Sequence, residues 1–141
     1  MLSNTSKYAV RAVIYLALNS EQNKKIGIKQ ISKDLGIPTP FLGKILQTLA
    51  KHKILSSTKG PHGGFGMNKK ASDISLIDIV DIIDGRDLFT RCLVRLDDCN
   101  SNAPCSMHSK YAEIRMDLLN LFEKQKFAEL VDEIKTKKSN L

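Results

Sequence analysis

All three cysteines of this chain fall within fourteen residues, and a histidine follows three positions after the last of them. The spacing is Cys92-x6-Cys99-x5-Cys105-x2-His108. Thiolates and imidazoles are ligands that soft transition metals prefer, so four such groups in one short segment predict a single metal site. Three cysteines cannot all pair within one chain, which argues against a disulfide framework.

Charge is distributed unevenly along the 141 residues. Residues 1–70 contain 12 Lys and Arg against two acidic residues, whereas residues 71–141 contain 10 Lys and Arg against 13 Asp and Glu. A basic half attracts polyanions such as nucleic acid, although a solvated basic surface has the same composition. No apolar run approaches the roughly 20 residues that span a bilayer, and no signal sequence begins the chain, so a cytoplasmic protein without membrane contact is expected.

The elements that carry this basic charge are predicted to be helical. Residues 5–19 are apolar on most sides and predict a helix that other elements must cover. Residues 28–35 have one apolar face, and Gly36 ends that short helix. Thr39 is predicted as the N-cap of a third helix with Pro40 as its first residue. Two short helices around a tight turn indicate a helix-turn-helix, with an ordinary αα-hairpin as the alternative.

A glycine-rich hairpin follows the third helix. Residues 54–58 and 65–67 read as strands, and the intervening segment 59–64 is a turn cluster. A hairpin in this place is a wing, and its glycines do not have the order of a P-loop. The fold class is therefore mainly α with a small β-hairpin wing, and residues 1–84 are predicted to be a winged-helix DNA-binding domain.

The remaining chain is predicted to hold the metal and to oligomerise. Residues 85–106 are expected to be an irregular cysteine-rich loop, in which a metal would supply the internal scaffold. Residues 107–141 are expected to form a dimerisation helix and a short C-terminal helix, because apolar residues there follow the a/d spacing of a coiled-coil seam. These are Met107, Tyr111, Ile114, Leu118 and Leu121. An amphipathic helix that docks on its own chain has the same pattern.

In these features the chain resembles the bacterial iron–sulfur winged-helix regulators of the IscR and NsrR type. The resemblance rests on segment 6–12 of the first helix, on 31–37 in the helix-turn-helix, on 59–65 in the wing and on the order of the cysteines and histidine. It implies a homodimer whose two winged helices read a pseudo-palindromic operator in double-stranded DNA. It also implies a 2Fe-2S cluster in each subunit that modulates DNA affinity.

The resemblance assigns the cluster ligands by position. Cys92, Cys99 and Cys105 match the thiolate ligands, and His108 matches the imidazole ligand of the IscR type. The NsrR type has an aspartate ligand where this chain has Lys7, and a lysine cannot supply a carboxylate.

Two features of the cysteine segment leave its ligand set and metal open. The gap between the first two cysteines is one residue longer than usual, which leaves Asp97 or Asp98 as an alternative oxygen ligand. Three cysteines and one histidine are also a common structural zinc set. Metal-free thiols that act as a redox switch are a third state.

DNA contacts are assigned from the same resemblance and from winged-helix geometry. Thr39, Phe41 and Lys44 are expected near the start of the recognition helix in the major groove. Lys51 and Lys53 are expected on phosphates, which position the protein without specifying sequence.

The wing is expected to complete this contact. Lys59 matches a basic position that enters the minor groove, and Gly60, His62 and Gly63 form the rest of the expected contact. Gly43 stands where the IscR type has a glutamate that helps to choose the DNA sequence, so the operator preference of that type is not carried over.

Three functions are compatible with these residues. The first is a DNA-binding regulator modulated by its cluster, and the second is a zinc-stabilised or thiol-based winged-helix protein without one. The third, a hydrolase that uses Cys and His, is disfavoured because no nucleophile elbow is present and a catalytic pair does not need three clustered cysteines. We therefore expect a regulator and not an enzyme.

Overall fold

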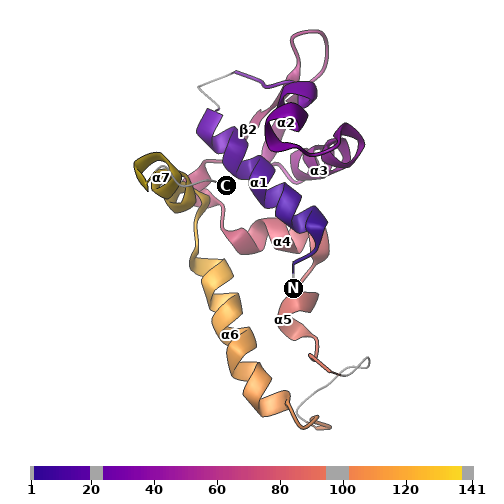
Figure 1. Ribbon diagram of the computed structural model, residues 1–141, viewed down its shortest axis with the longest axis vertical. Coiled ribbons are helices and arrows are strands. Elements are labelled where there is room, and N and C mark those ends of the chain that lie inside the picture. The colour runs from indigo at the N-terminus through magenta and orange to yellow at the C-terminus, as the bar shows by residue number, and fades with distance from the viewer. Residues whose placement is uncertain (1, 20–23, 95–101, 138–141) are drawn as a thin grey trace.

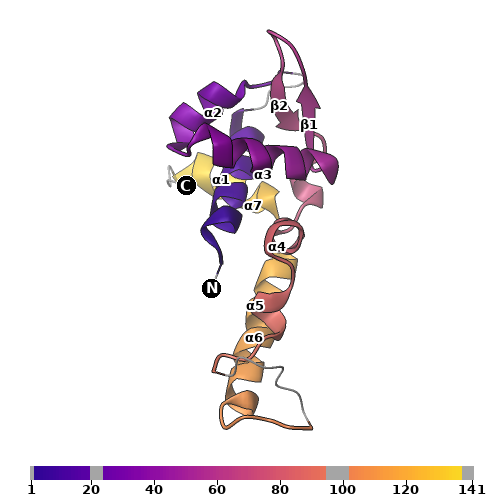
Figure 2. The same ribbon diagram turned by 90° about the vertical axis from the view of Figure 1, so that its right-hand side faces the viewer.

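A computed structural model describes residues 2–19, 24–94 and 102–137. It has a head that contains the first four helices, a β-hairpin and the last helix, and a stalk made by one long helix that leaves the head (Figure 1). A short helix runs beside the stalk (Figure 2). The described ends of the cysteine segment lie at the far end of the stalk, away from the hairpin.

Helix α1 (Asn4–Asn19) is the centre of the head. Ala9, Ala12, Val13 and Leu16 are fully buried, and the two alanines let neighbouring elements approach closely. Helices α2, α3, α4 and α7 and strand β2 all pack against α1. The expectation that this helix is covered on most sides is confirmed.

The helix-turn-helix consists of α2 (Ile28–Leu35) and α3 (Thr39–Lys51). Gly36 has a left-handed φ of 66°, as predicted for a glycine that ends a helix, and donates its N–H to the Ser32 carbonyl oxygen. The prediction that Thr39 is the N-cap is wrong. Thr39 is the first residue of α3 and donates its hydroxyl to Ser32 Oγ at 3.2 Å, which closes the turn between the two helices.

The wing pairs β1 (Leu55–Thr58) with β2 (Gly64–Met67) in antiparallel register. Ile26 adds a bridge to Phe65 on the other side of β2, so that the segment before α2 backs the hairpin. A Cβ atom on Gly64, whose φ is 154°, would overlap the Ile26 carbonyl oxygen. Glycine is therefore required where the wing joins the helix-turn-helix, and the predicted winged-helix architecture is confirmed.

The segment after the wing and the C-terminal helix complete the head. The 3₁₀ turn η1 (Ala71–Asp73) leads into α4 (Leu76–Asp84), whose N-terminus has a capping box between Ser75 and Asp78. Helix α7 (Phe127–Lys137) starts at a fully buried phenylalanine that packs in the main core. The Phe127 N–H donates to the Ile74 carbonyl at 2.9 Å, which fixes α7 to the segment before α4.

The stalk is α6 (His108–Lys124), and α5 (Asp87–Thr90) lies against it. The prediction that residues 85–106 are irregular is wrong over α5, because Phe89 packs edge-to-face on Phe122 with ring centroids 5.4 Å apart. One turn of helix is too short to show a periodic pattern, so only this contact reveals it.

The predicted a/d seam divides between two faces of α6. Leu118 packs in the second apolar cluster with Phe122, on the face towards α4 and α5. Ile114 and Leu121 are 60% and 54% exposed. Part of the seam thus docks on the same chain, and part remains on the surface.

Phe127→Ala tests the attachment of α7 to the head. We expect the free energy of unfolding to fall by about 3–5 kcal/mol, because the substitution leaves a cavity in the main core. Denaturant unfolding measures it. Phe41→Ala is the matched control, since that ring is 62% exposed and its removal should change stability little. Equal losses in the two variants would contradict the packing described for α7.

Candidate nucleic-acid interface and metal centre

Helix α3 turns a polar, basic face to solvent. Leu42, Ile45, Leu46 and Leu49 are buried on its inner side. The outer side carries a shallow groove of about 380 Å³. The groove is lined by Lys44, Gln47, Thr48 and Lys51. The structure thus places two of the predicted DNA contacts, Lys44 and Lys51, on one accessible helix face.

Other predicted contacts lie around α3. Phe41 stands exposed in its first turn. Lys53 occupies the turn before β1 with a left-handed φ of 61°, and its carbonyl oxygen accepts a hydrogen bond from Asn68 Nδ2 at 2.7 Å. The Thr39 hydroxyl closes the turn between α2 and α3, so this predicted contact also has a structural role in the helix-turn-helix.

A second groove, of about 580 Å³, lies between the wing and the helix-turn-helix. The predicted residues Lys59, Gly60 and Gly63 line it from the wing, whereas His62 is exposed but does not line it. Lys29 of α2 and Gln47 of α3 line it from the other side. The groove therefore joins the wing and both helices in one surface.

Sequence reasoning missed Lys29 and Gln47. A lysine in the first turn of a helix is unfavourable next to the positive end of the helix dipole. A lysine in this unfavourable position, such as Lys29, indicates an anion-binding site, because a bound anion would offset the repulsion. Gln47 gave no signal beyond its place on the polar face of α3.

At the far end of the stalk the structure brings two predicted metal ligands together. Cys92 Sγ and Cys105 Sγ are 3.3 Å apart, and both side chains are half-buried. The His108 N–H donates to the Cys105 carbonyl at 3.0 Å, which joins the third cysteine to the start of α6. Cys99, Asp97 and Asp98 lie outside the described residues. Among residues 2–19, 24–94 and 102–137, no group of three Cys, His, Asp or Glu side chains is arranged to hold a metal ion.

The separation of the two sulfurs fits a shared metal atom. Two thiolates at ~2.3 Å from one tetrahedral metal ion lie roughly 3.8 Å apart, so the pair needs to open by only about half an ångström. Soft thiolate donors suit iron–sulfur clusters and zinc alike. The observed 3.3 Å is also well beyond the about 2.05 Å of a disulfide bond, so these two sulfurs are not bonded to each other.

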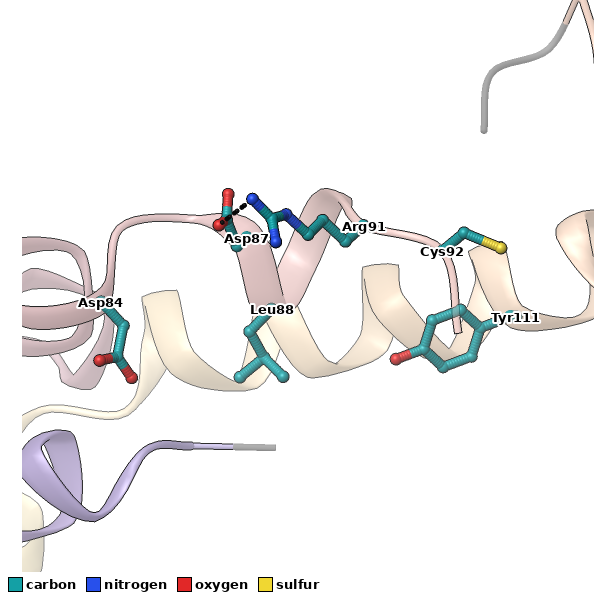
Figure 3. A pocket seen from close by; sticks show the side chains of 6 residues that line it. All are labelled: Asp84, Asp87, Leu88, Arg91, Cys92 and Tyr111. Atoms are coloured by element: carbon teal, nitrogen blue, oxygen red, sulfur yellow. Dashed lines mark ion pairs between the residues drawn. The ribbon is translucent and has the colours of Figure 1, made fainter. Parts of the chain in front are cut away.

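A pocket of about 350 Å³ connects this end of the stalk with the head. Figure 3 shows Cys92 and Tyr111 at one end of it and Asp84 at the other, with an Arg91–Asp87 ion pair of 3.0 Å between them. Asp84 accepts hydrogen bonds from Ser3 Oγ at 2.6 Å and from the Ser3 N–H at 3.2 Å. Burial alone would raise the pKa of Asp84, but the hydrogen bonds, led by that from Ser3, outweigh it and lower the pKa. The N-terminus of α1 is thus fastened to the end of α4, at the opposite end of the pocket from Cys92.

A family profile described as "Rrf2: Iron-dependent Transcriptional regulator" matches residues 2–133. The chain belongs to the Rrf2 family. It is 29% identical over 131 residues to the HTH-type transcriptional regulator IscR of Klebsiella pneumoniae (strain 342). The aligned region makes up 93% of this chain and 79% of that protein.

Two solved structures are similar to nearly all of the chain or to all of it. CymR, the global cysteine regulator of B. subtilis, superposes with a TM-score of 0.76 at 17% identity and covers 94% of this chain and 96% of its own. IscR of T. potens gives a TM-score of 0.76 at 17% identity and covers 100% of this chain and 93% of its own. At these identities the likeness establishes the fold.

Membership of the Rrf2 family makes the protein a DNA-binding transcriptional regulator and not an enzyme. The family predicted from the sequence is confirmed, and the hydrolase interpretation is discarded. Within the described part of the chain, no helix combines the length and apolar character needed to cross a bilayer.

The sulfur geometry makes a direct prediction for the metal-free protein. In a Cys99→Ser variant, a mild oxidant such as diamide should convert Cys92 and Cys105 into a disulfide, because their sulfurs are already in contact. The two thiols lose two hydrogens to diamide, and peptide mass mapping detects the cross-link. A variant that also carries Cys105→Ser is the control. Cross-linking only between two chains would contradict the described geometry.

Proposed function

We propose that this Rrf2-family protein is a homodimeric regulator whose affinity for a pseudo-palindromic operator is modulated by a 2Fe-2S cluster. The proposed ligands are Cys92, Cys99, Cys105 and His108, as in the resemblance to the IscR type. The observation that carries the proposal is the contact of Cys92 Sγ with Cys105 Sγ at 3.3 Å. The segments that bear these two cysteines are attached to the stalk, and Asp84 at the end of α4 accepts a hydrogen bond from Ser3 in the DNA-binding head.

The DNA-binding part of the proposal uses the two grooves. Thr39, Phe41 and Lys44 are proposed at the major groove. Lys51 and Lys53 are proposed on phosphates. In the wing, Lys59, Gly60, His62 and Gly63 are proposed at the minor groove. Lys29 joins the phosphate contacts, because it faces Lys59 across the second groove.

The proposed dimer forms through α6, with a second copy of this chain on its exposed face. Ile114 and Leu121 are two helical turns apart, so they lie on one side of the helix. The stalk projects from the head (Figure 2), which makes this side accessible to another stalk. Two recognition helices held in this way would face successive turns of one DNA duplex.

In this proposal, residues 85–106 and the start of α6 hold the cofactor. Contacts within the chain then transmit the presence or the redox state of the cofactor to the DNA-binding head. A 2Fe-2S cluster, when bound, supplies a redox-active centre that depends on iron and sulfide supply. Cys92, which follows α5, and Cys105, which precedes α6, would be two of its ligands. Asp84, the last residue of α4 and three residues before α5, binds Ser3 at the N-terminus of α1, on which α2 and α3 pack. A shift of Cys92 therefore has a short route to the recognition helix.

A second candidate function is thiol-based redox sensing without a cluster. The same 3.3 Å contact favours it, since oxidation would join Cys92 to Cys105 within the loop. A zinc ion held by the same donors is a third state of this site.

Anaerobic purification followed by iron, sulfide and zinc analysis distinguishes these states. We expect iron and sulfide in equal amounts with visible absorption, and we expect the cluster-loaded and cluster-free proteins to differ in affinity for an operator selected from random DNA. Coupling between two sites typically changes affinity about 5- to 150-fold. Zinc in place of iron, or equal operator affinity in the two forms, would overturn the cluster proposal. An affinity change that needs only thiol oxidation would favour the second candidate.

Lys51→Gln tests the phosphate contact on α3. We expect weaker binding to every DNA sequence alike, with the slope of log affinity against log salt reduced by roughly one. Lys135→Gln is the matched control, because it removes the same charge from an exposed position on α7. Unchanged slopes in Lys51→Gln would remove this residue from the interface.

A further inference from the structure

Helix α5 ends at Thr90, two residues before Cys92, and the carbonyl groups of Thr90 and Arg91 have a partner outside the helix. A helix of four residues leaves its C-terminal carbonyl oxygens without helical N–H donors. Arg115 Nη1, on α6, donates to the Thr90 carbonyl at 2.8 Å and to the Arg91 carbonyl at 3.0 Å. These are the two peptide groups that directly precede Cys92.

The Arg115 guanidinium is itself held in place. Its central carbon lies 5.4 Å from the centroid of the Tyr111 ring, one turn earlier on α6. Tyr111 lines the same pocket as Cys92 (Figure 3). A planar guanidinium that stacks on a ring loses little additional freedom when it binds two carbonyl groups.

Both ends of the cysteine segment are therefore fixed by the same helix. At the start of α6, the His108 N–H holds the Cys105 carbonyl, and two turns later Arg115 holds the backbone that enters Cys92. A rigid helix between these two attachments sets the distance between Cys92 Sγ and Cys105 Sγ.

We propose that Arg115 is a positioning residue that holds Cys92 against α6, so that the Cys92 and Cys105 thiols are paired before any metal binds. The role of this pairing in cofactor binding rests on the proposed function, whereas the pairing of the thiols does not. The neighbouring arginine ion pairs do not hold the backbone before Cys92 in this way. Arg91–Asp87 joins the first residue of α5 to the residue after the helix. Arg86 joins the turn after α4 to Asp81 and to Glu123 of α6.

The experiment measures thiol pairing in metal-free protein that carries Cys99→Ser. Glutathione disulfide first forms a mixed disulfide with one of the two cysteines and releases one glutathione thiol. The rate at which this mixed disulfide closes to the Cys92–Cys105 disulfide, with release of the second glutathione thiol, reports how often the two sulfurs meet. We expect Arg115→Met to slow this rate roughly five- to tenfold, the effect of losing about one net hydrogen bond. Arg115→Lys should restore only part of it, because an ammonium lacks the planar fork.

Arg86→Gln is the matched control, because it removes an arginine that contacts Asp81 and Glu123 but neither carbonyl before Cys92. Its pairing rate should equal that of the parent. Thermal unfolding of each variant shows whether the fold is retained. A parent-like rate in Arg115→Met, or the same loss in Arg86→Gln, would overturn the proposal.

A measurement with Cys99 present links the positioning to the cofactor. After anaerobic reconstitution, Arg115→Met should retain less iron and sulfide per chain than the parent when challenged with a chelator, and Arg86→Gln should match the parent. Equal retention in all three proteins would overturn the purpose assigned to the pairing. Failure of the proposed function is a separate result, namely equal operator affinity of the loaded and cluster-free parent, and it leaves the thiol-pairing rates unchanged.

Discussion

Burial of α1 is the constraint on which the rest of the structure depends. Ala9, Ala12, Val13 and Leu16 are completely buried, so the helix needs cover on sides that the helix-turn-helix and wing cannot reach. Helices α4 and α7 supply that cover, with Ile79 of α4 and Phe127 of α7 fully buried in the main core. The chain must therefore come back to the head after the stalk. This return leaves α6 as a projecting helix with one face against α4 and α5 and with Ile114 and Leu121 exposed.

Carboxylates of the described residues form hydrogen bonds within the scaffold in both halves of the chain. Asp34, one of only two acidic residues in the first 70, accepts hydrogen bonds from Tyr15 Oη at 2.5 Å and Gln30 Nε2 at 2.9 Å. Burial, together with the hydrogen bond to Asp34, raises the pKa of Tyr15 to about 12. In the acidic half, Asp78 caps α4 and Asp84 holds Ser3. These carboxylates form hydrogen bonds within the fold. The lysines of α2, α3 and the wing remain exposed to solvent.

The head could be predicted from sequence because its signals are local. The apolar spacing and terminal glycine placed α2 at Ile28–Leu35, and the glycine cluster placed the wing. The stalk could be predicted only in part. Apolar spacing does not say which partner an apolar face meets, so Leu118 and Ile114 belonged to one predicted seam but have different surroundings. Helix α5 and the role of Arg115 depend on contacts between residues 24 to 33 positions apart, for which the sequence has no periodic signal.

In the proposed mechanism, few contacts separate the cysteine segment from the DNA-binding head. Their free energies are of the size that regulation of DNA affinity requires. Ser3 Oγ accepts the Ser6 N–H at 3.0 Å, so it caps α1, and it donates to Asp84 at the same time. A side-chain cap of this kind contributes about 1 kcal/mol. Coupling energies between sites in regulated proteins are typically 1–3 kcal/mol. A movement of α5 that alters Asp84 would therefore exchange free energy of the right order with α1, on which the recognition helix packs. No large rearrangement of the core is required, because only the attachment of α1 at its N-terminus needs to change.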